Sequence, residues 1–437
     1  MQFALLAVLL ALTWQPAARA FTLLDAVQAA RAHDRTIAAA RLDQQAAHES
    51  YTQGVAGWLP RLSLDASHTV ETAQQSAYQR RGNDTVNQAS INLRQPILDM
   101  TRVAQLRKGS ALSALGDATL NVAEQKLLAE VAHAYLNVLV KRENLETLTH
   151  SRDQLAQRLA VVKAEVTLGI SSRIDADEAQ AAFDEAVAER LESENALDDA
   201  RSDLDRMTGL DSHTVRARFN TLSEHDVALP PLTELQDLAI LQPMLRQKMV
   251  EVDVAEQTVQ ERRGQFMPKL ELSARHQYSD RRSSYGPFAE RQGHGNMIGL
   301  NLSIPLYSGG ERRSQLREAR YQAQSRHEQL VAAQRAVSNA VAKHYMSANS
   351  GLNRIRASQQ RVASAQRKLE STTLGKSVGL RSNLDILKAE QEYTEARQKL
   401  AQAFHDYHLA RLELAFESGQ LDWSVLQALQ TTLTETS

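Results

Sequence analysis

Two short stretches decide how this sequence is organised. Residues 169–179 read GISSRIDADEA, and residues 379–389 read GLRSNLDILKA. A glycine, a serine, a branched apolar residue, an aspartate and an alanine recur in the same order, with a constant offset of 210. A serine three residues before an aspartate suits a helix N-terminal capping box, and the preceding glycine suits a turn with positive φ. Each stretch therefore predicts a turn between two helices.

The duplication extends through the chain. Residues 58–64 (WLPRLSL) return as 266–272 (FMPKLEL), and residues 91–97 (INLRQPI) return as 300–306 (LNLSIPL). Similar segments in the same order predict one structural unit written twice. We expect a first repeat at residues 21–230, a second at 231–420 and a C-terminal tail at 421–437.

The first twenty residues predict a signal peptide. The apolar run from Phe3 to Leu12 is too short to span a bilayer, and Ala18-Arg19-Ala20 is a cleavage pattern. Residues 1–20 are therefore expected to direct export and then be removed.

Composition excludes several classes of function. With 50 Lys+Arg against 52 Asp+Glu, the formal net charge is -2, which gives no electrostatic reason to bind nucleic acid. The chain has no Cys, which excludes disulfides, thiolate metal sites and a Cys nucleophile. We find no catalytic constellation, and we expect no cofactor and no metal. His405 and His408 share a helix face, which indicates a packed or solvated surface rather than a metal site.

Long helices dominate both halves. Abundant helix formers with few breakers predict a first helix, a very long helix and a returning helix in each repeat. Their expected bounds are about 23–56, 102–168 and 172–207, then about 235–263, 311–374 and 382–417. Sixty-odd residues correspond to roughly 100 Å of helix. The long helix of the first repeat carries a coiled-coil seam: Leu127, Val131, Ala134, Val138, Leu145, Leu148, Leu155, Leu159, Val162 and Val166.

Between the first and the long helix, each half alternates apolar and polar residues with period two. Residues 61–70 and 91–97 in the first repeat, and 269–278 and 298–306 in the second, each predict a strand of roughly ten residues. Polar loops are expected at 80–84 and 283–287. Pro60, Pro96, Pro268 and Pro305 are expected at the strand–helix junctions, where Pro stops strand pairing.

Four such strands cannot close on themselves, and an open edge is not tolerated in lipid. Several copies are therefore expected to share one barrel, with the long helices forming a tube beside it. The alternative is a soluble periplasmic coiled-coil adaptor or scaffold, although an adaptor would lack two ten-residue alternating hairpins.

The two turn motifs and the segment at 300–310 (LNLSIPLYSGG) resemble the TolC outer-membrane channel family over about residues 21–420. The resemblance implies a mainly α-helical homotrimer with a shared twelve-stranded barrel in outer-membrane lipid and a helical periplasmic tunnel. It also implies a passive exit duct for type I protein secretion or tripartite efflux. Its partners would be a periplasmic adaptor (membrane fusion) protein and an inner-membrane ABC or proton-driven transporter.

The resemblance further implies site residues. Family members narrow at the tip, where acidic residues form a cation-sensitive constriction. Asp385 matches the first aspartate of that ring, and Arg381 matches an arginine whose polar links hold the tip closed. Lys388 stands at a position that is often acidic, which argues against a double acidic ring. Asp175 is the equivalent of Asp385 in the first repeat, and for both aspartates a capping role and a constriction role stay open.

Gly169 and Gly379 have two interpretations in the same way. Each is expected to be a turn residue with positive φ. The resemblance additionally implies that both mark the surface on which the adaptor docks.

Overall fold

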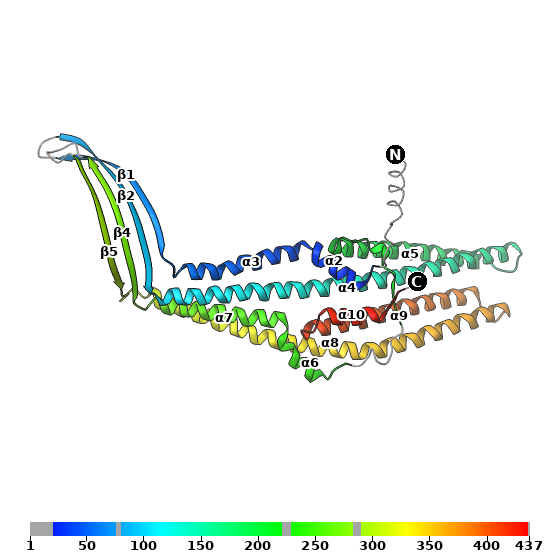
Figure 1. Ribbon diagram of the computed structural model, residues 1–437. Helices are drawn as coiled ribbons and strands as arrows, with labels where there is room; N and C mark the ends of the chain where they lie inside the picture. Colours follow the sequence, from blue (N-terminus) through cyan, green and yellow to red (C-terminus); the bar gives the residue numbers. More distant parts are fainter. Residues whose placement is uncertain (1–20, 76–79, 221–228, 283–289, 436–437) are drawn as a thin grey trace, which may run out of the picture. The chain divides into compact units, whose positions relative to one another are not determined.

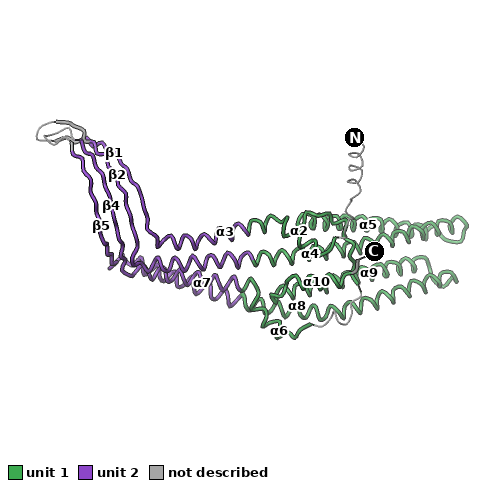
Figure 2. Tube along the Cα trace, viewed as in Figure 1, with its two compact units in different colours: residues 1–40, 121–245, 333–437 green, residues 41–120, 246–332 purple. Residues whose placement is uncertain are grey.

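The computed structural model describes residues 21–75, 80–220, 229–282 and 290–435 (Figure 1). The expected signal peptide and the expected loop at 283–287 lie outside these residues. The chain divides into two compact units (Figure 2). Unit 1 comprises residues up to 40, 121–245 and 333–437, and unit 2 comprises 41–120 and 246–332. Each unit takes segments from both halves of the sequence, so the repeat boundaries stay a prediction.

Unit 2 contains a four-stranded antiparallel sheet. Its strands are β1 (Arg61–Gln75), β2 (Arg80–Leu98), β4 (Lys269–Arg282) and β5 (Glu290–Ser303), in the order β1-β2-β4-β5. Each repeat supplies one hairpin, and the β2–β4 pairing joins the two hairpins, for example at Leu93 and Ala274. The strands are longer than expected. Residues 80–84, predicted as a loop, belong to β2, because the backbone ladder continues to the pair Gln75 and Arg80.

The two faces of this sheet differ in polarity. Cross-strand register places Leu62 opposite Leu93, and Leu272 opposite Leu300, so apolar side chains gather on one face. Many of them are exposed in the single chain: Leu62, Leu64, Ile298, Leu300 and Leu302. Polar residues such as Ser63 and Asn92 pair on the opposite face. The predicted alternation is therefore confirmed.

Helices of unit 2 pack closely through small residues. The helix α4 (Met100–Thr167) begins at Asp99, whose carboxylate accepts a 2.9 Å hydrogen bond from the Thr101 N–H. Beside α4 lies α3 (Arg35–Ala56). A Cβ on Gly109 of α4 would lie 2.4 Å from the carbonyl oxygen of Ser50, so this approach requires glycine. The unit also contains most of α7 (Pro243–Gly264) and the first part of α8 (Glu311–Ser377).

Unit 1 consists mainly of helices around an apolar core. The later part of α4 packs with α5 (Arg173–Thr208), and α8 is followed by α9 (Asn383–Glu417) (Figure 1). Seven of the ten predicted seam residues are buried: Leu127, Val131, Val138, Leu148, Leu155, Leu159 and Val162. Ala134, Leu145 and Val166 are partly buried against the same core clusters. The seam is therefore confirmed.

Residues 421–435 are an ordered part of unit 1. They form α10 (Trp423–Thr431) and β6 (Leu433–Glu435), and β6 pairs with β3 (Ala217–Phe219). Leu426 and Leu433 are buried in the core. The Arg142 guanidinium donates hydrogen bonds to the carbonyl oxygens of Val215, at 2.5 Å, and Ala217, which fixes β3 on α4.

Two helices predicted as continuous are broken. The first is split at Asp34 into α2 (Leu23–His33) and α3, because the Asp34 carboxylate caps the new helix by accepting from the N–H groups of Thr36 and Ile37. The second is split into α6 (Leu232–Leu238) and α7. There Pro243 holds the preceding Gln242 extended, at ψ 130. In the described part of the chain, no helix is both long and apolar enough to cross a membrane.

Candidate functional site: two tied helical turns

Both predicted turns have the same backbone geometry. The first turn (residues 168–172) joins α4 to α5, and the second turn (residues 378–382) joins α8 to α9. Gly169 has φ +73 and Gly379 has φ +80, the left-handed conformation that glycine adopts without strain. In the first turn the Ile170 N–H donates to the Glu165 carbonyl at 2.8 Å, and in the second Leu380 donates to Gly375 at 2.8 Å. These bonds close a Schellman motif on each helix.

A capping box then starts each returning helix. The Asp175 N–H donates to the Ser172 hydroxyl at 3.1 Å, while the Asp175 carboxylate accepts from the Ser172 N–H at 3.0 Å. Asp385 and Ser382 make the same pair of bonds, at 3.1 and 3.0 Å. The predicted capping interactions are thus present in both repeats.

The two aspartates differ in their surroundings. Hydrogen bonds from Ser172, aided by one from Ser171, lower the pKa of Asp175. Hydrogen bonds from Ser382 lower the pKa of Asp385, with further contributions from the positive charges of Arg381 and Lys388. Asp175 therefore lies in a network of hydroxyl donors, and Asp385 lies near two cations.

Polar contacts connect the first turn to the second. The Lys376 ammonium forms an ion pair with Glu165 at 2.8 Å, and both side chains are mostly buried. The buried Asn383 amide donates to the Ser171 hydroxyl at 3.4 Å. Because Ser171 in turn donates to Asp175 at 2.9 Å, the two turns share one hydrogen-bond network.

Arg381 and Lys388 are exposed on the second turn and on α9. The stem of Arg381 covers Gly375, where an added Cβ would lie 2.9 Å from the Arg381 Cγ. Lys388 lies one helical turn after Asp385 and lines a groove next to the turns. The structure thus brings Arg381 of the second turn close to Asp385 and Lys388 at the start of α9, while Asp175 lies at the start of α5, after the first turn.

The turns also expose apolar side chains that the sequence analysis did not single out. Leu168, Ile170 and Ile174 are 73%, 73% and 69% exposed around the first turn, and Val378 and Leu380 are 64% and 80% exposed around the second. We call these five residues the tip apolar cluster. Apolar residues on both sides of an αL glycine were the signal that could have revealed them. Exposed apolar groups of this kind mark interaction surfaces.

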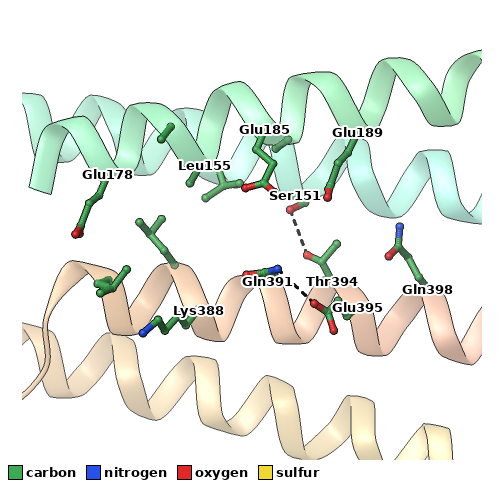
Figure 3. Close-up of a pocket in the computed structure, with 15 residues that line it drawn as sticks. Ser151, Leu155, Glu178, Glu185, Glu189, Lys388, Gln391, Thr394, Glu395 and Gln398 are labelled. Carbon is green, nitrogen blue, oxygen red and sulfur yellow. Dashed lines mark hydrogen bonds between the residues drawn. The ribbon is translucent and has the colours of Figure 1, made fainter.

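A groove of about 370 Å³ lies between α4, α5 and α9 (Figure 3). Leu155, Ala186 and Leu387 line its apolar part. Four glutamates also line the groove, Glu178, Glu185, Glu189 and Glu395. Burial, together with the negative charges of its neighbours, raises the pKa of Glu189. The groove is therefore a region of unfavourable negative charge beside the turns.

The four prolines lie near the ends of the strands. Pro60 and Pro268 directly precede β1 and β4, and Pro305 follows β5. Pro96 lies inside β2, where the register shifts between Pro96 and Leu98. A bulge accommodates Pro in a paired strand, because Pro has no N–H to donate.

No group of three or more His, Asp or Glu side chains is placed to hold a metal ion in the residues that the structure describes. His405 and His408 are buried on α9, and the His408 ring stacks on Phe219 with ring centroids 5.8 Å apart. These histidines belong to the packed core.

The chain thus combines long helical hairpins, tied at their turns, with a sheet that has one exposed apolar face, the kind of face that marks an interaction surface. The outer membrane efflux protein family model matches residues 26–210 and 235–420. The chain belongs to this family, whose model matches it in two successive segments. It is therefore an outer-membrane channel protein and not an enzyme.

Individual relatives support this assignment, and a solved structure shares the fold. The chain is 29% identical over 426 residues to the outer membrane protein TolC of Salmonella enteritidis, covering 95% of this chain and 85% of that protein. It is 29% identical over 422 residues to the alkaline protease secretion protein AprF of Pseudomonas aeruginosa, covering 93% and 86%. The crystal structure of the Campylobacter jejuni CmeC outer membrane channel has a TM-score of 0.81 at 14% identity, covering 94% of this chain and 90% of that one.

Proposed function

We propose that three copies of this chain form a passive outer-membrane exit duct. The four strands of each copy contribute to one twelve-stranded barrel in outer-membrane lipid, and the long helices form a periplasmic tunnel. Exposed Leu62, Leu64 and Leu300 on one face of the sheet support contact with lipid. Within the described residues, β1 and β5 each pair with one strand, so both have a free edge for a neighbouring copy.

The observation that carries the proposal is the link between the two turns. The Lys376–Glu165 ion pair and the Asn383–Ser171 hydrogen bond hold the ends of the two helical hairpins together. Polar links of this kind can be exchanged for contacts with another protein. The duct is therefore closed at rest, and its constriction is formed by the second turn, with Asp385, Arg381 and Lys388, and by Asp175 on the first.

A periplasmic adaptor opens the duct by docking on the turns. The tip apolar cluster supplies an apolar contact surface, and Gly169 and Gly379 keep the turn backbones in the shape that presents it. An inner-membrane transporter, ATP-driven or proton-driven, supplies the energy.

Type I protein secretion is the function that we favour, with tripartite drug efflux as the second candidate. A relative that matches most of this chain is named for alkaline protease secretion. The family name itself refers to efflux. The transporter and adaptor that act with the duct decide between the two.

Fractionation and reconstitution test the proposal. The mature chain should be recovered in the outer membrane as a heat-modifiable trimer, and it should form discrete conductances in a planar lipid bilayer. Co-expression with the exporter and adaptor of its own host should restore secretion of a protein substrate. Recovery in the soluble periplasm without a trimer would favour the adaptor alternative and reject the duct.

A further inference from the structure

Behind the two turns, a second set of polar contacts joins α4 to α9. The Ser151 and Thr394 hydroxyls are 3.2 Å apart, the Arg158 guanidinium lies 3.6 Å from the Glu390 carboxylate, and Arg397 lies 3.6 Å from Glu143. Arg158 precedes Glu165 by two helical turns of α4, so this pair lies behind the Lys376–Glu165 pair. Within unit 1, polar side-chain contacts thus join α9 to α4 at several positions along the two helices.

The Arg158–Glu390 pair is buried but incompletely satisfied. Only 9% of the Glu390 side chain is exposed, and 18% of that of Arg158. In the described structure, the Glu390 Oε2 atom and the Arg158 Nε atom have no hydrogen-bond partner. At 3.6 Å the pair is too long for a good hydrogen bond. The burial of these charges is therefore only partly compensated.

For the Glu390 carboxylate, the cost of burial exceeds the stabilisation by Arg158. Burial raises the pKa of Glu390, and the opposing effect of Arg158 is smaller. A buried ion pair can lose more by dehydration than it gains by attraction, whereas removal of one partner leaves a costly lone charge. By contrast, Lys376 reaches both oxygens of Glu165, at 2.8 and 3.1 Å.

We propose that Glu390 is a positioning residue that favours opening of the gate, which consists of the two turns and the α4–α9 contacts behind them. Packing of α9 on α4 holds the Glu390 carboxylate dehydrated beside Arg158, and separation of the two helices rehydrates it. The Lys376–Glu165 pair opposes this tendency. The two ion pairs thus have opposite effects on the stability of the closed state. The inference rests on the proposed function, because it requires a duct that opens.

The proposal predicts a different effect of each variant on opening than a clasp would, by which we mean an ion pair that only holds the two helices together. Glu390→Gln removes the dehydrated carboxylate and keeps the side-chain shape. The Arg158 side chain that remains is 18% exposed, against 9% for Glu390, and so keeps more contact with water; the closed arrangement should therefore become more stable. Arg158→Gln leaves Glu390 buried without compensation and should favour opening. The double variant has no buried charge, so Glu390→Gln should suppress the effect of Arg158→Gln. If the pair were a clasp, both single variants would open the gate.

A cysteine reporter measures separation of α4 from α9 in the full-length trimer. The chain has no Cys, so Ser151→Cys places one thiol at a buried position of this interface. Ser151 lines the groove but is only 9% exposed, so a bulky maleimide should label the thiol faster when the helices separate. We expect labelling to slow by about twofold or more in Glu390→Gln, and to accelerate by about tenfold or more in Arg158→Gln. The double variant should label no faster than the parent.

Matched controls come from the same helices. Glu143 and Arg397 are also 3.6 Å apart, but their side chains are 28% and 32% exposed, so Glu143→Gln should change labelling by less than about twofold. Thr394→Cys serves as a second reporter and should give the same order. Faster labelling in Glu390→Gln, or no suppression in the double variant, would overturn the proposal.

Conductance separates this inference from the proposed function. In a planar bilayer, the open probability should fall in Glu390→Gln and rise in Arg158→Gln. If no variant conducts while the labelling order holds, the duct proposal fails and the role of Glu390 in α4–α9 separation stands. If the parent conducts and both single variants open it, the duct proposal stands and this inference fails.

Discussion

Asp175 and Asp385 have the same structural role in the two repeats but different surroundings. Each accepts the N–H of a serine three residues earlier and begins a helix. The Asp175 carboxylate also accepts from Ser171, whereas Asp385 is influenced by the positive charges of Arg381 and Lys388. The capping bonds account for both aspartates, and the charged surroundings distinguish Asp385.

If Asp385 forms part of a constriction, its charge should attract multivalent cations into the duct. Asp385→Asn keeps a capping side chain but removes the charge, because Asn also caps helices. We expect weaker block of bilayer conductance by hexamminecobalt(III), and stronger block in Lys388→Asp. Ser382→Ala, which weakens the cap and keeps the charge, should leave block unchanged. Unchanged block in Asp385→Asn would exclude this residue from the constriction.

Acidification should loosen the first turn through Asp175. Its pKa is lowered in the folded chain by hydrogen bonds from Ser172, so its stabilising contribution is full above its unfolded pKa of about 3.9. That contribution disappears as pH falls through the lower folded value. Hydrogen-exchange protection of residues 168–175, corrected for intrinsic rates, should therefore decrease below about pH 4.

The decrease should be reduced in Asp175→Asn, which cannot titrate. Asp177→Asn, on the same helix but outside the capping box, should behave as the parent does. A loss of protection that is equal in Asp175→Asn and the parent would contradict the assignment to Asp175.

At the scale of elements, the two helical turns need glycine because of their backbone conformation and not because a side chain would lack room. Among the residues that the structure describes, and apart from the adjacent ones, no heavy atom lies within 4 Å of a Cβ built on Gly169 or Gly379, yet both have positive φ. Gly379→Ala should therefore destabilise the second turn by roughly 1–2 kcal/mol through strain alone. Asn tolerates this conformation better, so Gly379→Asn should be milder. Hydrogen exchange of residues 375–382 and affinity for the adaptor measure the two effects.

Both readouts are needed to distinguish a structural turn from a docking site. If Gly379→Ala loosens the turn and Gly379→Asn largely restores both protection and adaptor affinity, the glycine acts by shaping the surface. Full affinity in a loosened Gly379→Ala turn would show that docking does not depend on this backbone.

Sequence periodicity predicted most elements because it reflects burial. The seam from Leu127 to Val166 predicted α4, and the alternation around Leu62 and Leu300 predicted the sheet. Two local effects break helices that the periodicity predicted as continuous. They are the Asp34 cap, which begins α3, and Pro243, which ends the preceding segment. The length of the strands was also missed, since backbone pairing continues through polar residues.

The site was predictable only where it is local. Capping boxes and αL glycines lie within a few residues, so the sequence indicated them directly. The Lys376–Glu165 and Arg158–Glu390 pairs join residues more than two hundred positions apart, and only the packing of α4 with α8 and α9 brings them together. An exposed charge and a dehydrated one look the same in sequence.

For the whole molecule, duplication accounts for a sheet that a single repeat could not build. Each repeat supplies a hairpin, and the pairing of β2 with β4 joins them. Two of the four strands keep a free edge in the described part of the chain, and one face stays apolar. A sheet of this kind is incomplete in a single copy, because apolar side chains and open edges both require a partner.

The apolar face should therefore decide insertion into the membrane, and neighbouring residues of β5 separate the two faces. Ile298 lies opposite Ala274 on the apolar face and is 80% exposed, whereas Met297 lies opposite Arg275 on the other face and is 59% exposed. An arginine facing lipid near the bilayer midplane costs about 2–4 kcal/mol, while an arginine in a polar lumen costs little. Ile298→Arg should strongly reduce the heat-modifiable trimer in the outer-membrane fraction, and Met297→Arg should retain it. Equal loss in both variants would mean that general disruption of β5, and not contact with lipid, explains the defect; equal recovery would mean that the apolar face does not meet lipid.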